Sequence, residues 1–272
     1  MFGYEKFDSS FKLYLRAARA YLGLPKNVAS YGLISEVDWL LPHFQSHVRM
    51  VQYFSRILNT QSHRLLYKIY KWDLYLNKSG VLKTWSTEVR DIFAEHGLGH
   101  IFDDQHIFPI KSTVVRLKES MKSKQKELVK VECKQKPKLR TFLTFKEFGS
   151  LPSHVGKPLT FLERKLVSKL RLGILPIRIE TARYLHPVLP EIQRVCYCNN
   201  GDIESEFHFL FTCPMYTELR ENWIKSINCN NFTNMQPVDK FKLVLNQPGN
   251  VRLTAQFIVK AMDLRSKLNR QY

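Results

Sequence analysis

The sequence has few acidic residues, no long apolar run and little strand-like alternation. Asp and Glu number 24 against 42 Lys and Arg, which gives a formal charge of +18. No run of 18 apolar residues occurs, so we expect no membrane-spanning helix and no membrane partner. Residues 1–8 lack the apolar core of a signal peptide, and we therefore expect an intracellular protein of the nucleus or cytoplasm.

Cysteine is scarce as well, and its few copies are unevenly placed. Three of the five cysteines fall within residues 196–213, which argues against a disulfide framework and suits a reducing compartment. Apolar residues make up 44% of the 272 positions and aromatic residues 12%, enough for a buried core. Most of the chain is therefore expected to be folded.

Apolar residues recur at helical spacing along most of the chain, which predicts an all-α fold. We expect three segments: a helical bundle over 1–107, a basic helical connector over 108–157, and a helical region built around a Cys/His knuckle over 158–272. Residues 98–109 are predicted to be a loop, and Pro158 is predicted to open the next helix. The helix expected over 61–77 has an apolar side made of Leu65, Leu66, Ile69, Trp72 and Leu76.

A cluster of soft metal donors lies near residue 200. Its order is Cys-x-Cys-x9-His-x4-Cys, with Cys196, Cys198, His208 and Cys213 as the four donors. Three thiolates and one imidazole form a tetrahedral structural zinc shell, with a turn over 199–202 returning the chain to the first two sulfurs. Two alternatives stay open at this point. Cys213 and His208 could be core residues beside a loop cysteine pair, or the cysteines could have a disulfide or redox role.

The residues around this cluster resemble the region that follows the reverse transcriptase in non-LTR retrotransposon polyproteins. The match covers about 158–223, including the segments 169–173 and 180–183, and its motif residues are Cys196, Cys198, Glu206, His208, Cys213, Pro214, Tyr216 and Arg220. A weaker resemblance, to the thumb-like helices that follow the polymerase palm, covers about 12–100 and is carried by 16–24, 38–42, 63–65, 72–73 and 85–89. It implies a nucleic-acid-facing role for these helices in a chain that lacks the catalytic palm.

The basic residues are the candidates for contacts with RNA or DNA. Residues 111–157 alone hold 13 Lys or Arg and four Glu, which favours sequence-independent binding of the phosphate backbone. The residues selected for phosphate contact are Arg49, Arg56, Arg64, Lys68, Lys71, Arg164, Lys165, Lys169, Arg171, Arg178 and Arg183. A solvated basic surface without a ligand is the alternative for each of them.

Catalytic patterns are not found. A polymerase turn has an aromatic residue, any residue and then two aspartates, but Ile101 stands at the aromatic position before Asp103-Asp104. No carboxylate–lysine cluster of an endonuclease can be identified either. A metal site made of His100, Asp103, Asp104 and His106 is a further alternative, which we consider less favoured than a helix-linking loop. We therefore predict a non-catalytic nucleic-acid-binding protein with a structural zinc ion and no small-molecule substrate. The competing hypotheses are a structural or protein-interaction domain and an accessory fragment of an RNA-directed DNA polymerase.

Overall fold

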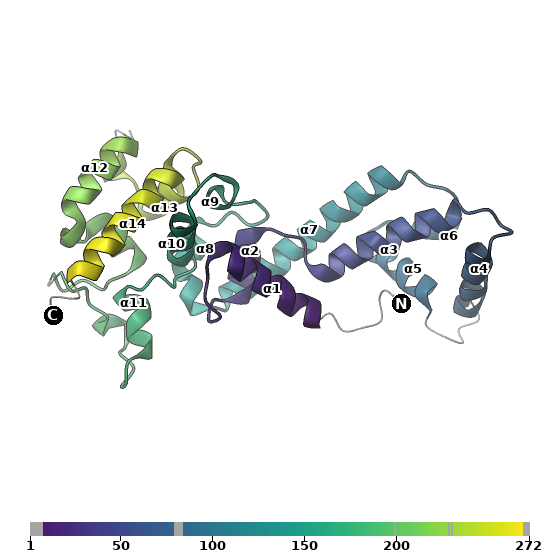
Figure 1. Cartoon of the computed structure of the whole chain (residues 1–272), viewed down its shortest axis with the longest axis horizontal. Coiled ribbons are helices and arrows are strands. Elements are labelled where there is room, and N and C mark those ends of the chain that lie inside the picture. Colours follow the sequence, from purple (N-terminus) through teal and green to yellow (C-terminus); the bar gives the residue numbers. More distant parts are fainter. Residues whose placement is uncertain (1–7, 79–83, 199, 228, 230, 269–272) are drawn as a thin grey trace. The chain divides into compact units, whose positions relative to one another are not determined.

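The computed structural model describes the whole chain except residues 1–7, 79–83, 199, 228, 230 and 269–272 (Figure 1). Its described residues form helices, turns and loops, with one isolated antiparallel bridge between Val195 and Ile203 and no strand. The predicted all-α fold is confirmed. No helix in the described ranges is long and apolar enough to cross a membrane.

Fourteen numbered α-helices, α1 to α14, organise the described part of the chain. The first seven are α1 (Asp8–Leu22), α2 (Ser30–Val37), α3 (Pro42–Leu58), α4 (Leu65–Lys78), α5 (Trp85–Glu95), α6 (Gly99–Asp104) and α7 (Ile110–Lys134). The others are α8 (Arg140–Phe145), α9 (Ser153–Gly156), α10 (Phe161–Arg171), α11 (Arg178–Thr181), α12 (Thr217–Ile227), α13 (Pro237–Leu245) and α14 (Asn250–Leu268). Short 3-10 or π-helical turns join several of them.

Two predicted boundaries were wrong. The segment 98–109 is not a plain loop, because α6 occupies its first half. The helix expected to open at Pro158 begins at Phe161, since Thr160 is its N-cap. The Thr160 backbone N–H donates to Glu163 Oε2 at 2.8 Å, and the Glu163 N–H donates back to Thr160 Oγ1 at 3.3 Å. This capping box satisfies two helix-end donors, and Pro158 has no N–H with which to join it.

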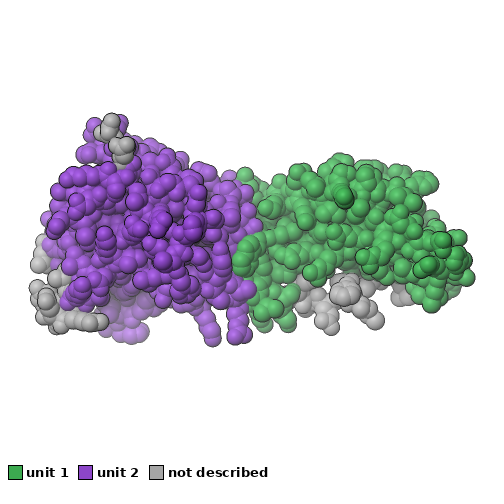
Figure 2. All heavy atoms as spheres, turned by 45° about the horizontal axis from the view of Figure 1, so that its top comes forward, with its two compact units in different colours: residues 1–14, 39–127 green, residues 15–38, 128–272 purple. Residues whose placement is uncertain are grey.

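The described chain divides into two compact units, which Figure 2 colours separately. Unit 1 comprises residues 1–14 and 39–127, and unit 2 comprises 15–38 and 128–272. Helices α1 and α7 each contribute residues to both units. The three consecutive segments predicted from the sequence differ from this division, because 15–38 belongs with the C-terminal part and the basic connector is shared.

Unit 1 is organised around an aromatic core. The Phe54 ring on α3 lies 5.9 Å from Tyr70 of α4, 5.7 Å from Phe93 of α5 and 5.4 Å from Phe102 of α6, measured between ring centroids. Offset and edge-on ring pairs at these distances add to the burial of apolar area. Three helices, α4, α5 and α6, thus meet at one side chain of α3.

The side of α4 that was predicted to face the core is not the side that the structure buries. Leu65, Ile69 and Trp72 are exposed, and the helix instead packs through Tyr70 and Leu74. These two buried residues lie on the opposite side of the helix, toward α3 and α5. Of the predicted side, Leu66 and Leu76 are half-buried, whereas Leu65, Ile69 and Trp72 are left in solvent.

Unit 2 has its core along α14, which packs against α10, α12 and α13. Trp223 of α12 stacks on Phe257 of α14 with ring centroids 4.5 Å apart. Phe209 in turn lies 6.3 Å from Phe257 and 5.2 Å from Tyr216. The segment that carries the last two metal-donor candidates, His208 and Cys213, is therefore seated on α14 by its own aromatic residues.

Candidate metal centre

The first two cysteines lie on a short reversal of the chain. The bridge between Val195 and Ile203 holds its two sides together, and the Cys196 N–H donates to the Asp202 carbonyl at 2.8 Å. Gly201, with φ of +75°, adopts the left-handed conformation that the reversal needs. The predicted turn is therefore present over the described residues 200–202; residue 199 lies outside the described residues.

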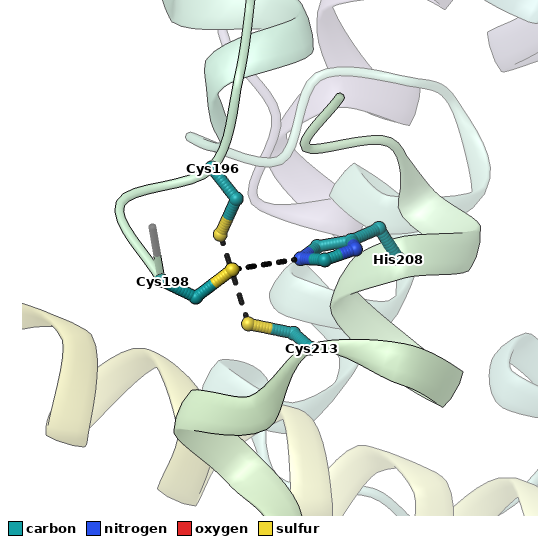
Figure 3. Close-up of side chains that lie close together, drawn as sticks. All are labelled: Cys196, Cys198, His208 and Cys213. Atoms are coloured by element: carbon teal, nitrogen blue, oxygen red, sulfur yellow. Dashed lines mark hydrogen bonds between the residues drawn. The ribbon is translucent and has the colours of Figure 1, made fainter. Parts of the chain in front are cut away.

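The position of Tyr197 explains how Cys196 and Cys198, with only one residue between them, can both direct their sulfurs to one point. Its side chain is exposed and its hydroxyl accepts from Arg178 Nη1 at 3.2 Å, while Cys196 is buried and Cys198 half-buried. The exposed Tyr197 side chain thus faces outward. The Cys196 and Cys198 sulfurs both point toward His208 and Cys213 (Figure 3). The tight Cys-x-Cys spacing is compatible with one shared ion.

The other two donors lie at the two ends of a single turn. His208–Thr212 is a π-helical turn, and the Cys213 N–H donates to the His208 carbonyl at 2.8 Å. The buried Arg220 guanidinium donates to the Leu210 carbonyl at 2.9 Å and to the Cys213 carbonyl. Carbonyls at the end of this turn, which have no partner within it, are satisfied by a side chain from α12. Arg220 therefore fixes the position of Cys213.

The four ligand atoms form a compact group whose members all lie within 4.8 Å of one another (Figure 3). The Cys196 and Cys213 sulfurs are 3.6 Å apart, and Cys198 Sγ is 3.5 Å from His208 Nε2. An ion bonded tetrahedrally at about 2.3 Å to sulfur and about 2.0 Å to nitrogen holds two sulfurs about 3.8 Å apart and a sulfur and a nitrogen about 3.5 Å apart. All five cysteines are free of disulfides. The cluster can hold a metal ion.

His208 is oriented for coordination by groups outside the cluster. Its Nδ1 lies 3.2 Å from Thr212 Oγ1 and 3.5 Å from Asp202 Oδ2. A carboxylate beside Nδ1 favours the tautomer with the proton on that nitrogen, which leaves the Nε2 lone pair directed at Cys198. Burial also lowers the pKa of His208, so the ring stays neutral near pH 7. Metal binding requires this neutral ring.

The three thiols of the cluster differ in the direction of their pKa shifts. The hydrogen bond to Cys213, together with burial, raises the pKa of Cys196. The same hydrogen bond lowers the pKa of Cys213, since its sulfur accepts the Cys196 proton. Burial raises the pKa of Cys198. A bound cation would displace these protons, because a coordinating thiol is deprotonated outright.

Two buried glutamates, Glu204 and Glu206, attach the segment that carries the four donors to the helices around it. The Glu204 carboxylate accepts from both terminal nitrogens of Arg265 on α14 and from the Arg178 backbone N–H at 2.6 Å. Glu206 accepts from Arg140 at 3.2 Å and from Thr141 at 2.9 Å. The Glu-x-Glu part of the motif therefore has a structural role, to hold the loop in place.

Sequence reasoning missed several residues that support the centre. Asp202 and Arg265 were not selected, because one lies in a turn and the other 52 positions beyond Cys213, with no spacing that links it to the cluster. Glu204 is two residues before Glu206 in the matched motif, which is the signal that could have identified it. The alternative site at His100, Asp103, Asp104 and His106 is not formed: in the described residues only the Cys/His cluster brings three or more such donors together.

The residues selected for phosphate contact divide into three groups. Arg49, Arg56, Arg64, Lys68 and Lys71 of unit 1 are exposed. Those in unit 2 other than Arg171 are half-buried, and three of them have partners: Arg164 lies over the Tyr21 ring, Arg178 over the Tyr197 ring, and Arg183 beside Glu180.

Arg171 was selected wrongly. It is fully buried, and its Nε and Nη2 donate to the buried Glu36 carboxylate at 2.7 and 3.1 Å. Its remaining nitrogen donates to the Leu245 carbonyl at 3.0 Å. A phosphate cannot reach a guanidinium whose donors are already used inside the core.

Comparison with known proteins does not identify the chain. No protein-family model matches it, and no curated protein or solved structure does. The function must therefore be argued from the residues of the chain itself.

Proposed function

We propose that this chain is a non-catalytic nucleic-acid-binding protein, derived from the region downstream of a non-LTR retrotransposon reverse transcriptase, with a structural zinc ion in its Cys/His cluster. It would bind RNA or DNA in the nucleus or cytoplasm. The observation that carries the proposal is the charge of +18 together with the exposure of basic side chains along the helices of unit 1.

Helix α7 supplies the densest part of this basic surface. Between residues 110 and 127 it has six Lys or Arg, all exposed, and two Glu. Lys111, Lys118, Lys122 and Lys126 recur at seven- and four-residue spacing and so follow one side of the helix. A row of cations in this arrangement suits a polyanion, whose condensed counterions are released on contact.

Zinc is the ion that this donor set favours. Three thiolates select soft or borderline ions, and a tetrahedral set of three sulfurs and one nitrogen is the usual shell of structural zinc. Cys196, His208 and Cys213 are buried, so water has little access to the ion. A shell that is full of protein ligands keeps no open position for chemistry, and the ion would serve to stabilise the loop.

The resemblance in residues 158–223 adds to the proposal through the roles of its residues. Cys196, Cys198, His208 and Cys213 converge on one point, and Arg220 fixes the backbone beside them. Asp103 and Asp104 are exposed at the end of α6. We therefore assign them no catalytic role.

Nucleic-acid binding is tested by measuring affinity for a labelled single strand and a duplex as salt rises. For six to ten phosphate contacts, affinity should fall by about 10³–10⁵ between 50 and 200 mM salt. Replacing Lys118, Lys122 and Lys126 with Gln should flatten this dependence, with Arg252→Gln on α14 of unit 2 as the exposed control. Affinity that is absent, or that does not change with salt, would favour a structural or protein-interaction domain instead.

Zinc is tested by measuring the metal content of the purified chain. One zinc per chain is expected, and Cys196→Ser or Cys213→Ser should lose it, whereas Cys133→Ser outside the cluster should keep it. Asp202→Asn should lower zinc affinity by about 10-fold, because the ring of His208 loses the carboxylate charge beside Nδ1 while Thr212 Oγ1 remains. A chain that is isolated with full stability and no metal would refute the zinc site.

A further inference from the structure

The exposed side of α4 combines aromatic, aliphatic and basic residues. Trp72 and Tyr75 are 64% and 62% exposed, and Ile69 and Leu65 are 56% and 72% exposed. The two rings stack on each other with centroids 5.7 Å apart and planes inclined by 29°. We call the residues Leu65, Lys68, Ile69, Lys71, Trp72 and Tyr75 the α4 outer face.

The α4 outer face occupies a continuous arc of the helix. At 100° per residue, Lys68 falls between Tyr75 and Trp72, with Lys71 at the edge beyond Tyr75. The other side of the helix already has its partners, because Tyr70 and Leu74 are buried in unit 1. Burying Trp72 and Tyr75 is therefore not needed for the core.

The charge of the α4 outer face is of one sign. Lys68 and Lys71 are exposed there, and the Lys71 ammonium lies 5.3 Å from the centroid of the Tyr67 ring at the edge of this face. The one acidic residue of the helix, Asp73, accepts from the Ser86 N–H at 2.9 Å and from Thr84 Oγ1 at 3.1 Å, which fixes the start of α5. No carboxylate of α4 is thus left to neutralise the two lysines. The surface is complementary to an anion that also has flat apolar groups.

Resting on the nucleic-acid binding proposed above, we infer that the α4 outer face is a binding site for unpaired nucleotides, with bases stacked on Trp72 and Tyr75 and phosphates held by Lys68 and Lys71. Every base has a π-face, so stacking on aromatic rings tolerates any sequence. In a duplex those faces are already stacked on neighbouring bases and cannot reach the rings. The site therefore selects single strands over duplexes, a preference that the lysines of α7 do not supply.

The test uses the full chain, a labelled 20-nucleotide single strand and the matching duplex. Trp72→Ala/Tyr75→Ala should weaken single-strand binding by at least about 20-fold, as expected for the loss of two base–ring contacts, and duplex binding by less than twofold. The variant Trp72→Phe/Tyr75→Phe keeps two aromatic rings and should retain most of the single-strand affinity of the parent chain. Leu13→Ala, at an exposed apolar residue of α1, should change neither.

The salt dependence separates stacking from charge. The double alanine variant should leave the slope of log affinity against log salt unchanged, whereas Lys68→Gln/Lys71→Gln should reduce it by about 1.4 for a single strand. A double alanine variant that binds single strands within twofold of the parent chain overturns this inference and leaves the proposed function standing. Equal losses for strand and duplex, or self-association of the parent chain that the variant abolishes, also overturn it. Failure of the parent chain to bind either probe overturns both proposals.

Discussion

Replacing Arg171 with Met should destabilise the protein strongly and leave nucleic-acid affinity unchanged. The guanidinium makes hydrogen bonds at 2.7 and 3.1 Å to Glu36 and at 3.0 Å to the Leu245 carbonyl, with both charged side chains buried. Burial by itself raises the pKa of Glu36, but Arg171, followed by His154 and Lys146, lowers it to about 2. Without Arg171 a buried carboxylate loses its main partner.

The magnitude follows from the position of this pair. Removing one partner of a buried ion pair costs about 3–5 kcal/mol, and Lys146, 3.6 Å from Glu36, can compensate only in part. At roughly 2–4 °C per kcal/mol for a domain of this size, the melting temperature should fall by about 6–20 °C. Urea titration followed by circular dichroism gives the change in the free energy of unfolding.

Two further variants make the test specific. Arg252→Met, at an exposed cation of α14, should change the free energy of unfolding by less than about 0.5 kcal/mol. Glu36→Gln alone should cost a similar amount of stability, because it leaves the buried Arg171 guanidinium and the buried Lys146 ammonium without their shared carboxylate. A loss below about 1 kcal/mol for Arg171→Met, accompanied by weaker nucleic-acid binding, would refute the structural role and restore the phosphate contact predicted from the sequence.

Two other predictions concern unit 2. Gly173→Ala should destabilise the protein by about 3 kcal/mol or more, because φ is +64° and the added Cβ would lie 2.1 Å from the Lys138 carbonyl oxygen. The control Gly97→Ala has a similar φ of +70° but open space around the added Cβ, and should cost only about 1 kcal/mol. Equal shifts of the urea midpoint for the two variants would contradict the clash at Gly173. Burial lowers the pKa of His154 to about 3 from its usual 6.5, so the unfolded chain binds more protons below pH 6.5 and stability falls as the pH falls, by up to about 1.4 kcal/mol per unit. Between pH 6.5 and 5 the free energy of unfolding, measured by urea titration, should therefore fall by about 1.6 kcal/mol more in the parent chain than in His154→Gln. Equal pH dependence would count against a neutral buried His154.

The helices and the clustering of the Cys/His donors could be predicted from local information. Helical periodicity and the end signals at Pro42 and Gly97 gave most helices of the described chain, since these depend on residues a few positions apart. The Cys-x-Cys-x9-His-x4-Cys spacing predicted a cluster that the structure brings within 4.8 Å. Because the four donors lie within 18 residues, one local reversal of the chain between Cys198 and His208 is enough to bring them together.

The direction of each apolar or basic side chain could not be predicted in this way. Trp72 was expected in the core and Arg171 on the surface, and the structure reverses both. A helical spacing shows which residues share a side, but not which side the neighbouring helices cover.

The sequence by itself determined an all-α chain with a strong positive charge and a local set of metal donors. Only the tertiary structure decided which cations are available to a phosphate, because Glu36 is 135 positions from Arg171 and meets it through packing. It likewise decided that Glu204 and Arg265, 61 positions apart, hold the segment of the Cys/His cluster against α14. Burial and pairing depend on contacts between distant segments, and spacing along the chain does not contain them.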